Sequence, residues 1–420
     1  MAIKKKKDSE IVLEFCVELS RRMILAGANV ERVQLAVERI CHAYALTDLD
    51  LVLLTHRVSL SAVDADGAFL FRQCTIPPAG IHLEQLRQLN TMAYEVYKTK
   101  PEPGGLFKLL ETATDAPERL DWKILLAQIA ALGSLCLIFG GGPKELTAVT
   151  LVTVVLHYVM VFSAGLGLDR VVMNAVNMWI ATVAAVLVMH SGISTNGPVI
   201  LITVSMLVIP GIPLVNSVRN LLCGNEMNGI LQLAKVTIET LSMGMGICVA
   251  LWMFGMADGM SDAVVTTMQD PVGLILVSFL ASCGFAVVFR IARGDIWRAG
   301  LGGALTRVML LVLSPIFPQR IVFVTLAAIA AGLYGELLAN LRRCPSTYFI
   351  YPAIIPLIPG DLFYYALVAL YLGDQQMFLS NAGSCMVSLA GMSIGFVLSS
   401  IIAHYARRMR FDRLAEYGRQ

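Results

Sequence analysis

Apolar residues come in long runs after residue 121, and short polar stretches separate the runs. Ten of them are long enough to cross a lipid bilayer as helices. They cover approximately residues 122–139, 145–166, 171–190, 197–215, 237–256, 272–289, 297–314, 320–340, 349–371 and 379–403. The seventh run is the weakest, because it contains three glycines and Arg307. The pattern predicts a polytopic α-helical membrane protein with ten spans.

The first 121 residues have a different pattern, in which apolar positions recur at helical spacing or alternate. Helical spacing over 9–26 and 83–98, and after a "GAN" break at 27–29, predicts three amphipathic helices. Residues 49–63 and 67–76 alternate and predict two strands joined by a turn at Asp64–Gly67. We therefore expect a small α/β domain and linker at 1–121, followed by two membrane halves at 122–256 and 257–420.

Composition supports this division. Hydrophobic residues make up 57% of the chain and charged residues 15%, more apolar than the roughly 45–50% of a soluble protein. The nine cysteines form no C-x-x-C pair, so we expect reduced, buried thiols and neither a zinc site nor a disulfide framework. No phosphate loop, G-x-S-x-G or H-E-x-x-H motif occurs. We expect no enzyme activity, no cofactor, no metal and no nucleic-acid partner.

The distribution of positive charge predicts the orientation. No leader pattern follows Lys4–Lys7, so the N-terminal region is expected to stay in the cytoplasm of a bacterial-type cell, below its inner membrane. With that orientation, the outer loops carry only Lys144 and Arg320, and the loop at 257–271 is acidic. The inner loops carry Arg170, Arg219, Lys235, Arg290, Arg293, Arg298, Arg342 and Arg343. This bias predicts a plasma-membrane protein with both termini inside.

A proline-glycine break occurs in the fourth and again in the ninth run. The stretches "SMLVIPGIPLVNSVRNLLCGN" and "AIIPLIPGDLFYYALVALYLGD" each contain Pro-x-x-Pro, and each has a Gly-polar pair about ten residues later. The break therefore falls in position four of two successive groups of five spans. Because five is odd, the two groups lie in opposite orientations, which is an inverted repeat of the kind found in many secondary transporters.

A broken helix in a bilayer exposes amides on one side of the break and carbonyls on the other. This is costly unless the break lines a polar cavity. Amides at a half-helix start attract a carboxylate, whereas carbonyls and the acid Asp361 attract an ammonium group or a proton. A zwitterion such as an amino acid suits such a site, and the alternative is a pair of kinks packed against neighbouring helices. The candidate substrate-binding residues are Pro210, Gly211, Pro213, Asn216, Ser217, Pro356, Pro359, Gly360 and Asp361.

Other polar residues within the runs have both functional and structural interpretations. Asp361 and Glu336 are the candidate proton-coupling acids, although Glu336 could instead pair with Arg342 or Arg343 near the inner end of its span. For Glu239, an i,i+4 pair with Lys235 is the simpler account.

Further residues could line the path or bind the substrate. Arg307 could face an anionic group or balance Glu336. Asn174 and Asn177 lie three residues apart and could line the path or link helices. His157 is more typical of a packed hydrogen-bonding residue than of a ligand.

Two rival functions follow from the same pattern. A channel would need a continuous polar stripe along several spans, and a membrane enzyme or sensor led by the N-terminal domain would need a cluster of reactive side chains. The sequence shows neither. The glycines at 300, 302 and 303 could allow close contact between copies of the chain, so a homo-oligomer is also considered.

The chain resembles the threonine/serine exporter family over nearly its full length. The resemblance rests on "RRMILAGANVERVQLAVERICHAYAL" with Gly27, Ala28 and Arg32, on "TIPPAGIHLEQLRQLN", and on the two break motifs "VIPGIPLVNSVRNLLCGN" and "IIPLIPG". It implies export of small hydroxy amino acids driven by the proton gradient. Because split relatives have been linked to dicarboxylate efflux, export of a dicarboxylate such as succinate is the alternative.

Overall fold

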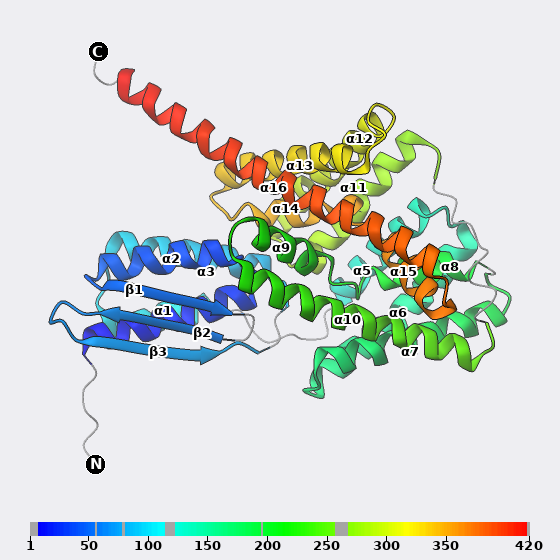
Figure 1. The fold of residues 1–420 in the computed structure, drawn as a ribbon, viewed down its shortest axis with the longest axis horizontal. Coiled ribbons are helices and arrows are strands. Elements are labelled where there is room, and N and C mark those ends of the chain that lie inside the picture. Colours follow the sequence, from blue (N-terminus) through cyan, green and yellow to red (C-terminus); the bar gives the residue numbers. More distant parts are fainter. Residues whose placement is uncertain are drawn as a thin grey trace. The chain divides into compact units, whose positions relative to one another are not determined.

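The computed structural model describes residues 7–54, 57–77, 80–113, 122–194, 196–256 and 268–417, with side chains described up to residue 406 (Figure 1). Asp258 and Asp262, which belong to the acidic loop at 257–271, lie outside the described residues. The chain forms two compact units. The first comprises Met1–Arg119, Phe289–Ala292 and Ala339–Tyr348, and the second comprises the rest.

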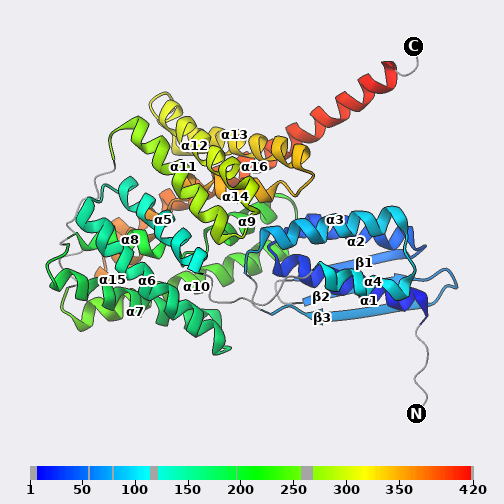
Figure 2. The same cartoon turned by 180° about the vertical axis from the view of Figure 1, so that it is seen from behind.

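The first unit is an α/β domain with one three-stranded antiparallel sheet in the order β1-β2-β3. Its helices cover one face of the sheet (Figure 2), where Phe15 and Leu19 of the first helix and Leu60 of the middle strand are fully buried. Its elements are α1 (Asp8–Leu25), α2 (Val30–Ala43), β1 (Thr47–Leu54), β2 (Arg57–Val63), β3 (Phe69–Thr75), α3 (Leu83–Thr99), η1 (Pro103–Gly105) and α4 (Leu106–Thr112).

The sequence predicted two strands, at 49–63 and 67–76. This was wrong, because the sheet has three strands and the stretch 49–63 contributes to both β1 and β2. Leu54, the last residue of β1, pairs with Arg57, the first residue of β2, and Val63 of β2 pairs with Phe69 of β3. A single strand of fifteen residues would be about 50 Å long. The 18-residue helix α1 spans only about 27 Å. A hairpin matches the length of the sheet to the helix that covers it.

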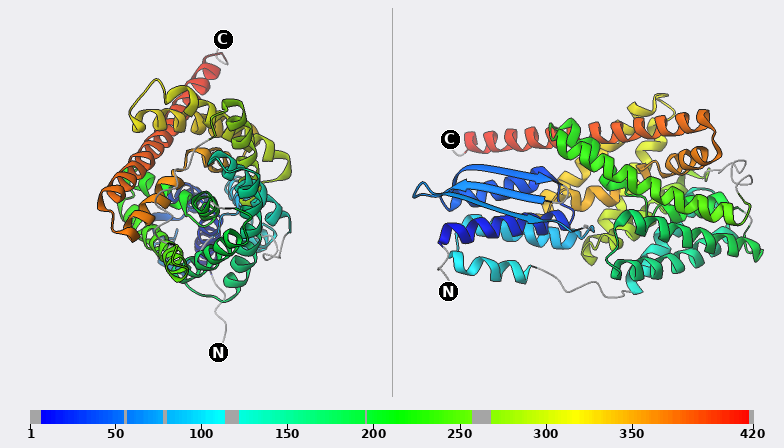
Figure 3. Two further views of the ribbon diagram at one scale, coloured as in Figure 1. Left: turned by 90° about the vertical axis from the view of Figure 1, so that its right-hand side faces the viewer. Right: turned by 60° about the horizontal axis from the view of Figure 1, so that its bottom comes forward.

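The second unit is helical. Its elements are α5 (Trp122–Ile138), α6 (Pro143–Gly165), α7 (Arg170–His190), α8 (Gly197–Ser205), α9 (Gly211–Leu222), α10 (Glu226–Met253), α11 (Pro271–Val288), η3 (Arg293–Asp295), α12 (Ile296–Leu313), α13 (Arg320–Arg342), α14 (Thr347–Ala353), η4 (Ile355–Leu357), α15 (Gly360–Leu372) and α16 (Gln375–Tyr417). The last of these is one continuous helix, orange to red in Figure 3.

Seven helices of the described part of the chain are long and apolar enough to cross a membrane. They are α6, α7, α10, α11, α12 with η3, α13 and the portion of α16 up to Ala406. The remaining three of the ten predicted runs do not reach that length. Trp122–Ile138 is a 17-residue apolar helix, and the fourth and ninth runs are each interrupted. The interruptions at the predicted places are therefore part of the fold.

The order of elements recurs along the second unit with a spacing of 149 residues. Helix starts that correspond are 122 and 271, 211 and 360, and 226 and 375. Packing recurs as well. A Cβ atom at Gly246 of α10 would overlap the carbonyl oxygen of Ala175 in α7, and one at Gly395 of α16 would lie 2.7 Å from that of Thr325 in α13. Corresponding glycines thus let corresponding helices approach closely.

The glycines of α12 pack within the chain. A Cβ atom at Gly302 would lie 2.7 Å from Cβ of Ala353, and one at Gly303 would lie 3.0 Å from the carbonyl oxygen of Ser278. Gly300 likewise lies against Phe279. The three glycines therefore serve contacts inside the chain, and a homo-oligomer stays a prediction.

Candidate functional site

The first break separates α8 from α9 at residues 206–210. The chain turns through Pro210, which has φ −78° and ψ 57°, and Gly211 donates its backbone N–H to the carbonyl of Ile209 at 2.8 Å. Pro213 lies inside the first turn of α9, where a missing N–H is tolerated because that donor has no partner within the helix. The unwound residues are therefore 206–210 and not the predicted Pro210–Pro213.

The second break separates α14 from α15 and has the same local turn. Pro359 has φ −81° and ψ 59°, and Gly360 donates to the carbonyl of Ile358 at 2.9 Å. Pro356 lies in the short 3-10 helix η4 before that turn. The two Pro-x-x-Pro patterns suggested that Pro213 corresponds to Pro359. The backbone instead matches Pro210 with Pro359, so the repeated unit is the Ile-Pro-Gly tripeptide.

The two breaks touch each other, as the sequence predicts. A Cβ atom at Gly211 would lie 3.0 Å from Cγ2 of Ile358, and one at Gly360 would overlap the side chain of Met206. Each glycine therefore packs against a residue of the opposite break. A side chain at either position would push the two half-helices apart.

Two polar bonds connect the first break to other helices. Asn216 of α9 donates its side-chain amide to the hydroxyl of Tyr351 in α14 at 2.9 Å, and Ser393 of α16 donates its hydroxyl to the carbonyl of Val215 at 3.2 Å. Ser217 is fully buried and donates to Leu214 of its own helix at 2.7 Å. Of the two predicted polar residues after this break, Asn216 thus bonds to α14, the helix before the second break, whereas Ser217 bonds to its own helix.

Asp361 follows the second break in the first turn of α15 and is half-buried. Its charge interacts with the guanidinium group of Arg307 in α12. Arg307 also donates from Nε to the hydroxyl of Ser278 in α11 at 2.9 Å. The sequence suggested Glu336 as one partner of Arg307, and the structure identifies Asp361 as an electrostatic partner.

A second polar bond between helices corresponds to the one made by Arg307. Nδ1 of His157 in α6 lies 2.8 Å from Oε1 of Gln128 in α5, and His157 is buried. Gln128 and Ser278 are 150 residues apart along the chain, and so are His157 and Arg307. His157 is thus a packed hydrogen-bonding residue, as expected, and Arg307 occupies the equivalent place beside the second break.

The remaining predicted residues are Asn174, Asn177 and Glu336. Asn177 of α7 is 3% exposed and its Oδ1 has no hydrogen-bond partner among the described residues, while Asn174 is half-buried. Glu336 is half-buried in α13 and has an interaction of its own. The structure thus joins the two breaks by contact, and it relates Asp361 to Arg307 by charge.

Two residues that the sequence analysis missed lie near the breaks, and a third residue, Glu239, has surroundings that differ from those expected. Tyr351 bonds to Asn216, and Tyr364 of α15 is 1% exposed with a hydroxyl that has no partner among the described residues. Glu239 of α10 is 4% exposed, and its Oε1 also has no partner there. Its carboxylate interacts more strongly with the charge of Arg170 than with the charge of Lys235. Tyrosines in apolar runs resemble ordinary core residues, so no sequence signal marked the first two.

These features define a multi-pass membrane protein with a polar, charged centre where two interrupted helices meet. The family model described as "Putative threonine/serine exporter" matches residues 14–254, and that described as "Threonine/Serine exporter, ThrE" matches residues 274–402. The chain belongs to the threonine/serine exporter family and is a transmembrane transporter.

Two curated relatives match over nearly the whole chain. One is a "Threonine/serine exporter" of Corynebacterium glutamicum, 20% identical over 414 residues, with 94% of this chain and 83% of the relative covered. The other is a "Probable threonine/serine exporter" of Mycobacterium tuberculosis, 23% identical over 425 residues, with 95% and 78% covered. No solved structure matches the chain.

Proposed function

We propose that the chain is a secondary active exporter of threonine and serine that is driven by the proton gradient. The observation that carries the proposal is the meeting of the two Ile-Pro-Gly breaks, with the half-buried acid Asp361 after the second break and the half-buried cation Arg307 interacting with its charge. Family membership and the names of the two relatives support the substrate class.

The chemistry of the breaks fits an amino-acid zwitterion. In the first turns of α9 and α15, the amides of Gly211 and Gly360 are already bonded and Pro213 has no N–H. The amides that have no partner within these helices and could donate to a carboxylate, together with Arg307, are those of Ile212, Asp361 and Leu362. Asp361 offers its charge to an ammonium group, and the bonded pair Asn216–Tyr351 offers a donor and an acceptor to a side-chain hydroxyl. The prolines and glycines of the two breaks keep the backbone open at this place.

We further propose ten spans in two inverted repeats, 122–256 and 257–420, after a cytoplasmic domain and linker at 1–121. The recurrence of helix starts at 149 residues and the matching turns at Pro210 and Pro359 support two repeats. Five spans per repeat make the repeats opposite in direction. The positive charge of the predicted inner loops supports cytoplasmic termini in a bacterial inner membrane.

For coupling, we propose that Asp361 exchanges a proton during the transport cycle, with Glu336 as a second proton-coupling residue. Asp361 is the acid that interacts with Arg307, so binding of a proton or of a substrate ammonium group at Asp361 changes the local charge balance in the same way. Competition between proton and substrate at one carboxylate would link outward substrate movement to inward proton movement.

The test is uptake by inside-out vesicles that contain the chain, with labelled threonine, serine and succinate, each with and without an imposed pH gradient. The proposal predicts accumulation of threonine and serine that is abolished when a protonophore collapses the gradient. Vesicles from cells without the chain are the control. Uptake of succinate alone would replace the amino-acid assignment by a dicarboxylate, and gradient-independent equilibration would indicate a channel.

A further inference from the structure

The start of α3 is hydrogen-bonded to a segment that follows α11, and both belong to the first unit. Leu83 donates its backbone N–H to the carbonyl of Phe289 at 3.0 Å, and Glu84 donates to that of Arg290 at 3.2 Å. The first amides of a helix have no partner within it. The carbonyls at 289 and 290 therefore complete the first turn of α3, and α3 in turn fixes this loop.

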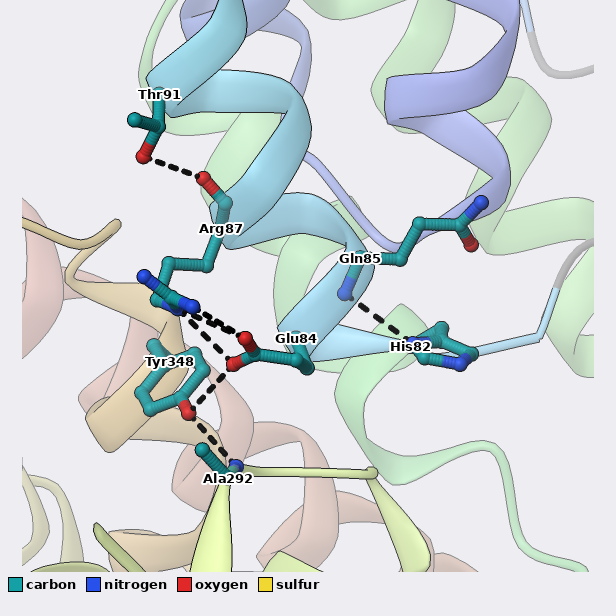
Figure 4. Close-up of polar contacts among 7 residues, drawn as sticks. All are labelled: His82, Glu84, Gln85, Arg87, Thr91, Ala292 and Tyr348. Carbon is teal, nitrogen blue, oxygen red and sulfur yellow. Dashed lines mark hydrogen bonds and ion pairs between the residues drawn. The ribbon is translucent and has the colours of Figure 1, made fainter. Parts of the chain in front are cut away.

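A side-chain network extends this contact between α3 and residues 289–290 to a third segment (Figure 4). The hydroxyl of Tyr348 donates to Oε2 of Glu84 at 3.0 Å and accepts the backbone N–H of Ala292 at 2.8 Å. Glu84 also pairs with Arg87 one turn along α3, with Nε of Arg87 3.0 and 3.1 Å from the two carboxylate oxygens. One phenol thus joins the N-terminal domain, the loop after α11 and the start of α14. We call this bonded group of Glu84, Ala292 and Tyr348 the junction.

Burial and charge make these bonds strong ones. Tyr348 is 1% exposed and the side chain of Glu84 is 17% exposed, so water competes weakly for either group. The hydrogen bond and charge of the Glu84 carboxylate raise the pKa of Arg87. A phenol can both donate and accept, and here it does both, whereas phenylalanine could do neither. Ala292 would then lose the acceptor that this phenol provides.

The junction holds the ends of several helices that lead to the second break. Residues 289–292 connect α11 to η3 and α12, the helix that carries Arg307. Tyr348 lies in the first turn of α14, which ends six residues before Pro359. We propose that Glu84 and Tyr348 are positioning residues through which the N-terminal domain fixes α14 and the loop after α11 during transport. This role rests on the transport function proposed above.

A structural readout tests the junction independently of transport. In the purified full-length chain, Tyr348→Phe and Glu84→Gln should each accelerate backbone amide exchange in peptides covering 82–87 and 289–293 about tenfold or more. Glu95→Gln is the matched control, because Glu95 is exposed on the same helix and loses the same charge. The double variant should exchange no faster than Tyr348→Phe alone. Exchange that stays at the wild-type rate in both single variants would overturn the junction.

Transport kinetics test the positioning role. In proteoliposomes, both variants should lower the maximal rate of threonine transport at least threefold and leave KM unchanged, because neither residue belongs to the proposed substrate site. Glu95→Gln should transport as the wild type does. Accelerated exchange with wild-type kinetics would overturn the positioning role. A wild-type chain that moved no substrate would overturn the proposed function, while the exchange data would still report whether the junction exists.

Discussion

The close contact of the two breaks can be tested by adding a single methyl group. Gly360→Ala places a Cβ atom where the side chain of Met206 lies, whereas Gly360 has an ordinary backbone conformation that alanine adopts freely. The substitution therefore tests space and not backbone freedom. Overpacking of this kind costs about 1–3 kcal/mol. Gly383→Ala is the matched control, because nothing lies within 4 Å of a Cβ atom there.

A second substitution should relieve the first. Met206→Ala alone should destabilise the chain by about 1–2 kcal/mol, because Met206 is only half-buried. It also vacates the space that the new methyl group needs. The double variant should therefore be more stable than the sum of the single effects predicts, by about 1 kcal/mol.

Thermal unfolding of the purified chain measures these effects. Gly360→Ala should lower the Tm by a few degrees, the double variant should lower it by less than the sum of the two single losses, and Gly383→Ala should leave the Tm unchanged or raise it. Gly360→Ala should also slow transport, since the half-helices are pushed apart. Strict additivity of the two substitutions, or a fully stable Gly360→Ala chain, would refute the contact.

Three further predictions concern polar residues. Arg307→Lys keeps the charge but loses the planar donor group that bonds to Ser278, so threonine binding by calorimetry should weaken about tenfold; unchanged affinity would remove Arg307 from the site. Asn216→Ala should raise the KM for threonine in proteoliposomes severalfold and leave folding intact; an unaltered KM would show that its bond to Tyr351 is structural only. Glu239→Gln replaces a buried acid by a neutral isostere, so it should not lower the Tm, and a loss of several degrees would show that the charge is required there.

Much of the second unit follows from sequence pattern because prolines and glycines act locally. The breaks in the fourth and ninth runs were predictable, since proline removes a helical donor wherever it occurs. Which prolines correspond was not, because that depends on the dihedral angles at Pro210 and Pro359. The division of the stretch 49–63 into β1 and β2 was missed for a related reason: the apolar alternation continues through the stretch, and only the length of α1 limits the strands.

Contacts between distant segments were beyond reach of the sequence. Nothing in "YFIY" marks Tyr348 as a partner of Glu84 or Tyr351 as a partner of Asn216, since those partners are 264 and 135 residues away. Asp361 was predictable as a candidate because an acid inside an apolar run is costly. Its electrostatic interaction with Arg307 was not predictable, because the sequence offered Glu336 as the acid that balances Arg307.

The central claim is that the second break holds an ionisable group that couples substrate to protons, and Asp361→Asn tests it most directly. Asparagine is nearly isosteric with aspartate but cannot ionise, and the N-cap of α15 is Pro359 and not Asp361, so the variant should fold as the wild type does. The measurement is threonine accumulation driven by a pH gradient in proteoliposomes that contain equal amounts of either protein. The account predicts that the Asp361→Asn chain loses gradient-driven accumulation. Full accumulation by the well-folded variant would contradict it.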